Sequence, residues 1–233
     1  MHVDDFLHIG NAYFVENVIE RLRKAFLVGS TGKEAFSYIG LDVVTSESGI
    51  VLTQSKFVDK LRASPLSVDR RTQKDSKLDK YEHEQFRKTV GQLNWAAQHT
   101  RPDLVFEVLE LSMKLTKPCV QDYARAIKAL RKLQSCDVGV FIPNLGDFGN
   151  WKLIVFTDAA FANLFDKVSS ASGYIVFLVD SNLNCSPLCW KSANKIKRKV
   201  RSTLAAEALA LEMGIEHAIF FERTFEGNVY NIL

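Results

Sequence analysis

Two neighbouring aspartates, Asp4 and Asp5, stand almost at the start of the chain. The apolar residues around them predict a strand that breaks at the pair and resumes from Phe6 to Gly10, which together would form a hairpin. Carboxylates on such a turn can ligate divalent metal ions together with nucleotide phosphates, which is the chemistry of two-metal phosphoryl transfer. Asp-Asp is also common in solvated turns, so the pair alone leaves both interpretations open.

Two further acids have surroundings that suit a metal ligand. Asp158 follows the apolar run 153–156, so we expect it at the carboxyl end of a strand, where side chains emerge into clefts. Glu207 lies in an Ala- and Leu-rich stretch, 202–219, that predicts a helix. A carboxylate in such apolar surroundings is costly unless it pairs or binds metal. Alternatively, Glu207 occupies the solvated stripe of an amphipathic helix.

A basic run separates these two acids. Six cations occur there without an acidic neighbour, namely Lys191, Lys195, Lys197, Arg198, Lys199 and Arg201. Such a run is either a solvated loop or a surface that grips a phosphate backbone, and both interpretations stay open. The formal net charge is only +3, so a nucleic-acid partner would be held by a local patch and not by the field of the whole molecule.

Composition limits the class of protein. A chain of 233 residues with 47% apolar residues can form one large or two small domains with a real core. No signal peptide and no apolar run of about 20 residues is present, which predicts an intracellular protein, cytoplasmic or nuclear, that is neither secreted nor membrane-bound. The cysteines lack metal-site spacing and are expected to be buried thiols in a reducing compartment. They are Cys119, Cys136, Cys185 and Cys189.

Hydrophobic periodicity predicts the elements of the first half of the chain. An amphipathic helix is expected from Phe14 to Phe26, followed by a strand from Ala35 to Val44. A second strand, Ile50 to Thr53, completes a hairpin. A short helix capped by Ser55 follows, and the polar stretch from Ser64 to Lys80 is typical of an exposed linker.

Helices and then strands are expected beyond the linker. Prolines at 102 and 118 separate three helical segments, because proline cannot continue a helix. The segments are Tyr81 to Gln98, Asp103 to Leu115 and Gln121 to Gln134. Short apolar runs then predict four strands, at Gly139 to Ile142, Trp151 to Thr157, Gly173 to Val179 and Leu188 to Lys191.

Several motifs occur in a characteristic order. His2-Val3-Asp4-Asp5 resembles the Tyr-x-Asp-Asp motif of reverse transcriptases. The stretch from Phe86 to Trp95, with Thr100-Arg101-Pro102-Asp103-Leu104, is similar to the connecting region of copia-type retrotransposon Pol polyproteins. The family's ribonuclease H motifs resemble four later segments, namely Thr157–Ala162, Ser172–Tyr174, Trp190–Ser192 and Ser202–Glu207. The resemblance covers nearly the whole chain.

The resemblance implies an α+β or α/β fold in three parts. These are a reverse transcriptase palm and thumb remnant (1–64), a linker and helical connection region (65–135), and an incomplete ribonuclease H-like mixed sheet with a packed helix (136–233). It also implies that the catalytic metal ligands are Asp4, Asp5, Asp158 and Glu207. They would hold Mg²⁺ or Mn²⁺, while the basic run would contact an RNA–DNA hybrid or other nucleic acid.

The sequence also departs from the family pattern. His2 replaces the usual tyrosine, the family's fingers and a third polymerase aspartate would lie before Met1, and the later Asp-Asn motif is not found after Glu207. We therefore expect a fragment of a reverse transcriptase and ribonuclease H that is inactive as an isolated chain. The alternatives are a non-catalytic nucleic-acid-binding module and a degenerate remnant without function.

Overall fold

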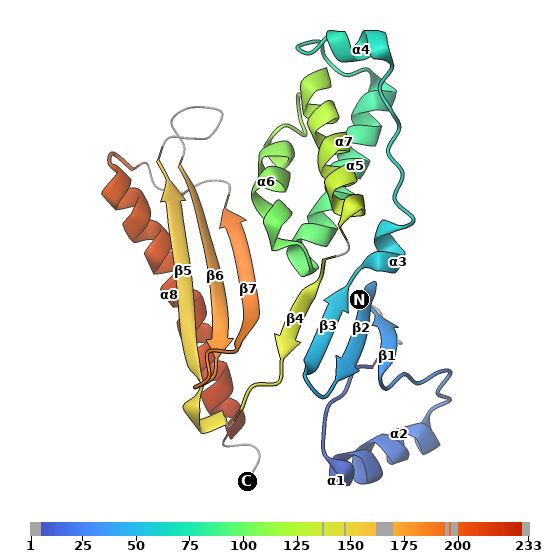
Figure 1. Cartoon of the computed structure of the whole chain (residues 1–233), viewed down its shortest axis with the longest axis vertical. Helices are drawn as coiled ribbons and strands as arrows, with labels where there is room; N and C mark the ends of the chain where they lie inside the picture. The colour runs from blue at the N-terminus through green and yellow to red at the C-terminus, as the bar shows by residue number, and fades with distance from the viewer. Residues whose placement is uncertain are drawn as a thin grey trace.

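The computed structural model contains two antiparallel sheets and a separate group of helices (Figure 1). It describes residues 6–136, 138–146, 148–161, 170–193, 196 and 200–229. The α+β prediction is confirmed, and every strand pair in the described residues is antiparallel. The first sheet has four strands and the second has three.

The first sheet combines a local hairpin region with one distant strand. Its order is β1 (Ala35–Tyr38), β2 (Leu41–Ser46), β3 (Gly49–Thr53) and β4 (Val140–Pro143). Because β4 pairs with β3, a strand expected in the third part of the chain belongs to the sheet of the first part. Hydrogen bonding therefore crosses the expected division at residue 136.

A tight turn divides the segment expected to be one strand. Tyr38 pairs with Leu41, and the two residues between them have positive φ, 48° for Ile39 and 77° for Gly40. Two successive positive φ values are the signature of the turn that matches the twist of a two-residue hairpin. The prediction of a single strand from Ala35 to Val44 is therefore wrong, and the chain reverses within it.

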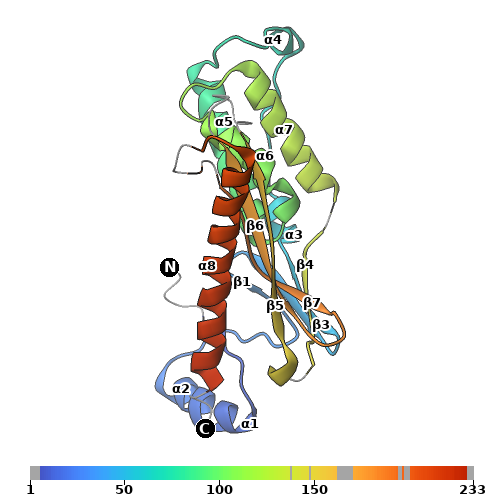
Figure 2. The ribbon, with the colours of Figure 1, turned by 90° about the vertical axis from the view of Figure 1, so that its left-hand side faces the viewer.

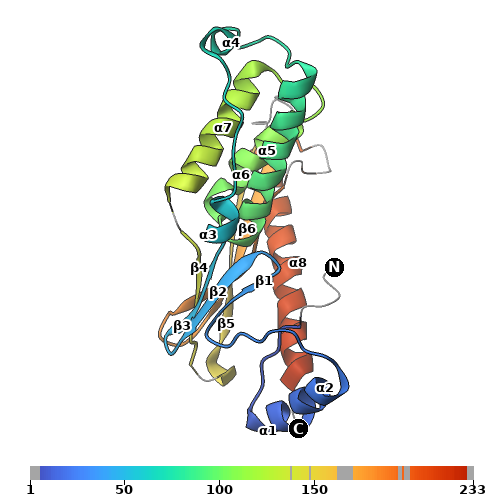
Figure 3. The ribbon, with the colours of Figure 1, turned by 90° about the vertical axis from the view of Figure 1, so that its right-hand side faces the viewer.

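Residues 12–25 form a largely exposed helical segment near the start of the described chain. Helix α1 (Ala12–Phe14), a π-helical turn (Val15–Ile19) and α2 (Glu20–Ala25) form the predicted amphipathic helix, at the opposite end of the molecule from α4 (Figure 3). Residues 6–10 contain no strand, so the expected second arm of the N-terminal hairpin is wrong. Asp4 and Asp5 lie outside the described residues.

The central helices share the largest core of the described structure. They are α3 (Ser55–Val58), α4 (Val68–Thr72), α5 (Lys80–His99), the 3₁₀ turn η2 (Pro102–Leu104), α6 (Val105–Met113) and α7 (Val120–Ser135). Helices α5, α6 and α7 confirm the three helical segments predicted between residues 81 and 134. Asp79 and Glu82 form a capping box that starts α5. Phe86, Leu93 and Leu130 are almost fully buried between the helices. We call α3 to α7 the helical unit.

The segment 64–80 is packed against the helical unit. Leu66 is buried, Ser67 caps α4, and Arg70 makes a 2.8 Å ion pair with Glu82 at the start of α5. Most of the segment is exposed, as predicted, but the short helix α4 and these contacts hold it to the helical unit. Its polar residues make the contacts that fix it.

Arg101 joins two parts of the helical unit. Its guanidinium donates to both carboxylate oxygens of Asp103, at 2.8 and 2.9 Å, and to the carbonyl oxygens of Leu133 (3.3 Å) and Cys136 (3.1 Å) at the end of α7. Only 4% of the Arg101 side chain is exposed. The Thr-Arg-Pro-Asp segment thus has a structural function.

We expect Asp103 to make stability depend on acidity. Hydrogen bonds from Arg101 lower the pKa of Asp103 to about 2, which is below its unfolded value of about 4. Its contribution is therefore complete above about pH 4 and is lost as the pH falls through 2. Because 45% of the side chain is exposed, screening limits this contribution to about 1 kcal/mol. Between about pH 4 and 2, the free energy of unfolding in urea should fall more for the native chain than for Asp103→Asn. The same pH dependence in both proteins would contradict this prediction.

The second sheet packs beside the helical unit. Its strands are β5 (Lys152–Ala160), β6 (Ala171–Val179) and β7 (Cys185–Ala193), with a 3₁₀ turn at Phe148–Asn150 before β5. Helix α8 (Thr203–Val229) runs along β5 and β6 (Figure 2). The β7 edge lies toward β4 and α6 (Figure 1). These strands and α8 confirm the predicted elements, with longer boundaries.

The cysteines and the helices test two further predictions. All four thiols are free, but Cys136 and Cys185 are exposed and the other two are half-buried. The prediction of buried thiols is therefore wrong, although partial burial raises the pKa of the Cys189 thiol.

None of the described helices combines the length and apolar character that a membrane crossing requires.

Candidate nucleic-acid interface

Three of the sequence motifs meet in one row of the second sheet. Asp158 pairs with Gly173, and Gly173 pairs with Ser192 on the next strand. In the adjacent row, Tyr174 lies between its partners Thr157 and Lys191. Segments that lie 15 and 19 residues apart in the sequence thus become neighbours across β5, β6 and β7.

The two faces of this sheet have different neighbours. A Cβ atom on Gly214 of α8 would lie 2.5 Å from Thr157 and 2.8 Å from Val155, so α8 can approach this face closely only with glycine there. Side chains alternate along a strand, which places Phe156 and Asp158 on the opposite face. Asp158 is exposed, and it lines a cavity together with residues of α6.

Glu207 lies at the margin of the contact between α8 and the sheet. Its neighbours Ala206 and Ala210 are buried in a cluster with Ala159, whereas Glu207 is half-buried. Ala159 belongs to the face that α8 covers, and Asp158 belongs to the other face. The register therefore does not favour one metal ion held by both acids.

The expected magnesium or manganese ion would need a group of ligands. Within the residues that the structure describes, no three His, Cys, Asp or Glu side chains gather as a metal site. The metal-binding roles of Asp4 and Asp5 stay predictions outside the described residues. The metal-binding roles of Asp158 and Glu207 also stay predictions.

The basic run lies between β7 and α8. Lys191 in β7 and Arg201 before α8 are both exposed, while Lys195, Lys197, Arg198 and Lys199 lie outside the described residues. Ile196, in the middle of the run, is 7% exposed, packs in the cluster under α8, and donates its backbone N–H to the Ser170 carbonyl at 3.1 Å. The run is therefore anchored to the sheet at one apolar residue.

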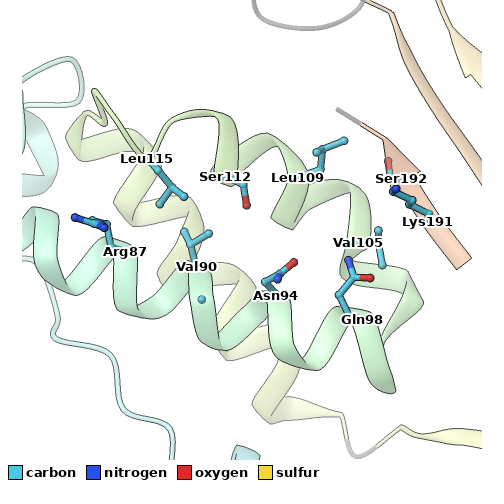
Figure 4. A pocket seen from close by; sticks show the side chains of 11 residues that line it. Arg87, Val90, Asn94, Gln98, Val105, Leu109, Ser112, Leu115, Lys191 and Ser192 are labelled. Carbon is cyan, nitrogen blue, oxygen red and sulfur yellow. The ribbon is translucent and has the colours of Figure 1, made fainter. Parts of the chain in front are cut away.

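A cavity of about 440 Å³ opens between α5, α6 and β7 (Figure 4). Its base is apolar, with Val90, Val105 and Leu109. Arg87 and Lys191 lie at opposite ends of it in Figure 4. Sequence reasoning missed the α5 and α6 residues, because a polar stripe on a helix normally indicates a solvated face.

A second cavity, of about 330 Å³, continues from the first along the sheet. The two share Val105, Lys191 and Ser192 as lining residues. Aromatic side chains dominate the second cavity, namely Phe106, Phe156, Tyr174 and Trp190, and Asp158 also lines it. We call the two cavities together the interdomain groove. The Tyr174 ring itself lies 4.4 Å from that of His217 in α8, and burial there raises the pKa of Tyr174 to about 12.

Trp190 fixes the groove by docking the sheet on the helical unit. Its indole N–H donates to the Ala97 carbonyl of α5 at 2.9 Å, and its ring packs against the core of the helical unit. The donor is satisfied while the ring is partly buried, as is usual for tryptophan at an interface. The two walls of the groove are therefore held by a specific contact.

Comparisons with known proteins place the chain beside an uncharacterised relative. No family model matches the sequence. An uncharacterised mitochondrial protein of Arabidopsis thaliana is 26% identical over 226 residues, covering 91% of this chain and 89% of that protein. The likeness thus extends over nearly the whole length of both proteins.

Proposed function

We propose that this chain is related to the reverse transcriptase and ribonuclease H of copia-type retrotransposons and binds nucleic acid without turning it over. The observation that carries the proposal is the row of the second sheet in which Asp158, Gly173 and Ser192 meet. The motifs that resemble ribonuclease H are separate in the sequence, and a shared row gives a structural reason for their order.

The geometry of the acids supports binding without cleavage. Hydrolysis by two metal ions requires carboxylates that hold both ions about 4 Å apart. Asp158 and Glu207 belong to different sides of β5, and Mg²⁺ held by few protein ligands relies on substrate phosphates. A second candidate, a remnant without function, is distinguished by the absence of any salt-sensitive binding.

We expect no metal-dependent cleavage but measurable binding of an RNA–DNA hybrid. With Mg²⁺ or Mn²⁺, the native chain should cut a labelled hybrid no faster than the double variant Asp158→Asn, Glu207→Gln. About four phosphate contacts from the basic run should give a slope of roughly −3 to −4 for log binding constant against log salt. The contacts are assigned to Lys195, Lys197, Arg198 and Lys199.

A charge-matched control distinguishes binding by the basic run from attraction by positive charge anywhere on the protein surface. Replacing Lys195, Lys197, Arg198 and Lys199 with Ala should flatten the salt slope, whereas replacing four exposed lysines elsewhere should leave it nearly unchanged. The control set is Lys60, Lys74, Lys88 and Lys128, all exposed. Cleavage that the double variant abolishes would overturn the non-catalytic proposal. Binding that is insensitive to salt and to both sets would leave the remnant interpretation.

A further inference from the structure

The part of the interdomain groove on α5 carries positive charge without a compensating acid. Arg87, Gly91, Asn94 and Gln98 recur at helical spacing along one stripe of α5, and all four line the larger cavity. The stripe rises about 16 Å along the helix. The polar groups of this cavity are cations, amides and hydroxyls, with no carboxylate in its lining.

These polar groups are free to bind a ligand. In the described part of the chain, neither Arg87 nor Lys191 pairs with a carboxylate. Two other arginines of the helical unit each form an ion pair with a carboxylate, Arg101 with Asp103 and Arg125 with Glu110. Lys191 lies in the row of Thr157 and Tyr174, whose side chains face α8, so Arg87 is the cation on the α5 wall of the groove.

The aromatic part of the groove offers flat, exposed rings. Phe156 is 60% exposed and Phe106 is 45% exposed, although both are large apolar side chains. They stand on opposite walls, one on β5 and the other on α6, and both line the smaller cavity. Aromatic rings beside a cationic groove are what proteins use to stack the bases of a strand whose phosphates follow the cations.

We propose that the interdomain groove binds single-stranded nucleic acid, with phosphates at Arg87 and bases against Phe106 and Phe156. The inference rests on the proposed nucleic-acid function, but it places a separate contact on residues that lie outside the basic run. A single strand is the fitting partner because its base faces are free to stack, whereas a duplex or hybrid hides them. Asn94 and Gln98 supply amide donors and acceptors along the same stripe of α5 as Arg87 (Figure 4).

Gly91 gives the groove space at a cost to its helix. It lies in the interior of α5, where glycine is about 1 kcal/mol less favourable than alanine. A Cβ atom added there would meet nothing within 4 Å, so close packing does not require glycine at this position. A larger side chain would project into the cavity that Gly91 lines. Gly91→Leu should therefore fill the groove and stabilise the helix together.

The charge contact is tested with neighbouring cations on α5. A labelled oligothymidine of about ten nucleotides is titrated with the full chain, followed by fluorescence anisotropy. Arg87→Gln should weaken binding about five-fold and reduce the salt slope by about 0.7. Lys88→Gln, an equal charge change at an exposed residue outside the groove lining, should change affinity less than two-fold. Equal effects of both changes would overturn the assignment.

The stacking contact and the groove volume are tested in the same assay. Phe156→Ser should weaken binding about ten-fold, whereas Phe220→Ser, at a 63% exposed phenylalanine of α8, should leave it unchanged. Gly91→Leu should weaken binding at least five-fold while raising the melting temperature, which excludes unfolding as the cause. If Phe156→Ser and Gly91→Leu both bind like the native chain, the groove is not the site.

Two further arms separate this inference from the proposed function. If a nucleoside triphosphate binds alone with the same dependence on Arg87 and Phe156, the groove is a nucleotide site and the single-strand inference fails. If the groove variants leave single-strand binding intact while the basic-run variant abolishes hybrid binding, the inference fails and the proposed function stands. If single-strand and hybrid binding are both absent, both fail. Loss of single-strand binding in the groove variants, with hybrid binding kept, is the expected result.

Discussion

Replacing Phe86 with Ala should lower the free energy of unfolding by about 3 to 5 kcal/mol. Phe86 of α5 is fully buried and meets the ring of Tyr123 in α7 edge-on, with centroids 6.3 Å apart. Truncation removes the transfer free energy of the ring and leaves a cavity that rigid helices fill only in part. The edge-on pairing adds to the loss, because aromatic pairs are stabilising beyond their buried area.

Urea unfolding followed by helical circular dichroism measures this change. Phe86→Leu should cost less than Phe86→Ala because it keeps most of the buried volume. Phe220→Ala, at an exposed phenylalanine, should stay within about 0.5 kcal/mol of the native chain. A loss below about 1 kcal/mol for Phe86→Ala would contradict the packing of α5 against α7.

Local signals made the helical unit predictable from sequence. Asp79 followed by Glu82 marks the start of α5, and Pro102 fixes where it must end. The predicted and observed boundaries of α5 and α7 differ by a single residue at each end. Strong caps and a 3.6-residue apolar period act within a few residues, so they can be recognised without knowing the tertiary contacts.

Non-local pairing and unusual backbone were not predictable. Residues 35–44 consist mostly of apolar and small polar residues without an Asn-Gly or Asp-Gly signal, so the positive φ of Ile39 had no marker in the sequence. The pairing of β4 with β3 joins segments about 90 residues apart, and hydrophobic pattern gives no partner for a strand. Leu66 is a single buried anchor within a mostly exposed, polar segment, so the sequence did not reveal that the segment is held to the helices.

The candidate interface was predictable in its residues but not in its geometry. The motifs named Asp158 and Lys191 as candidate residues, and only the sheet register shows that they lie in adjacent rows. The face to which Asp158 points depends on strand parity and on where α8 packs, and a shift of one residue would reverse it. The α5 side of the interdomain groove had no motif, since Asn94 and Gln98 gain meaning only when β7 docks beside them.

Arg101→Ala should be the second large loss of stability, about 2 to 4 kcal/mol. The change leaves the carbonyl oxygens of Leu133 and Cys136 without their donor at the end of α7. A cation at that end also favours the helix dipole, so the loss has an electrostatic part. Asp103 keeps Lys132 at 3.1 Å and is half-exposed, which limits the cost on the carboxylate side.

A comparison of substitutions distinguishes this arrangement from a simple ion pair. Arg101→Lys should lose nearly as much as Arg101→Ala, because one ammonium cannot form the bidentate pair and also reach two carbonyls. Asp103→Ala should lose about 1 kcal/mol, and a double-mutant cycle should give a coupling smaller than the loss at Arg101 alone. If Arg101→Lys retained native stability, the contacts to the carbonyl oxygens would contribute nothing measurable to the free energy of unfolding. The Thr-Arg-Pro-Asp segment would then owe its arrangement to Pro102 and the ion pair alone.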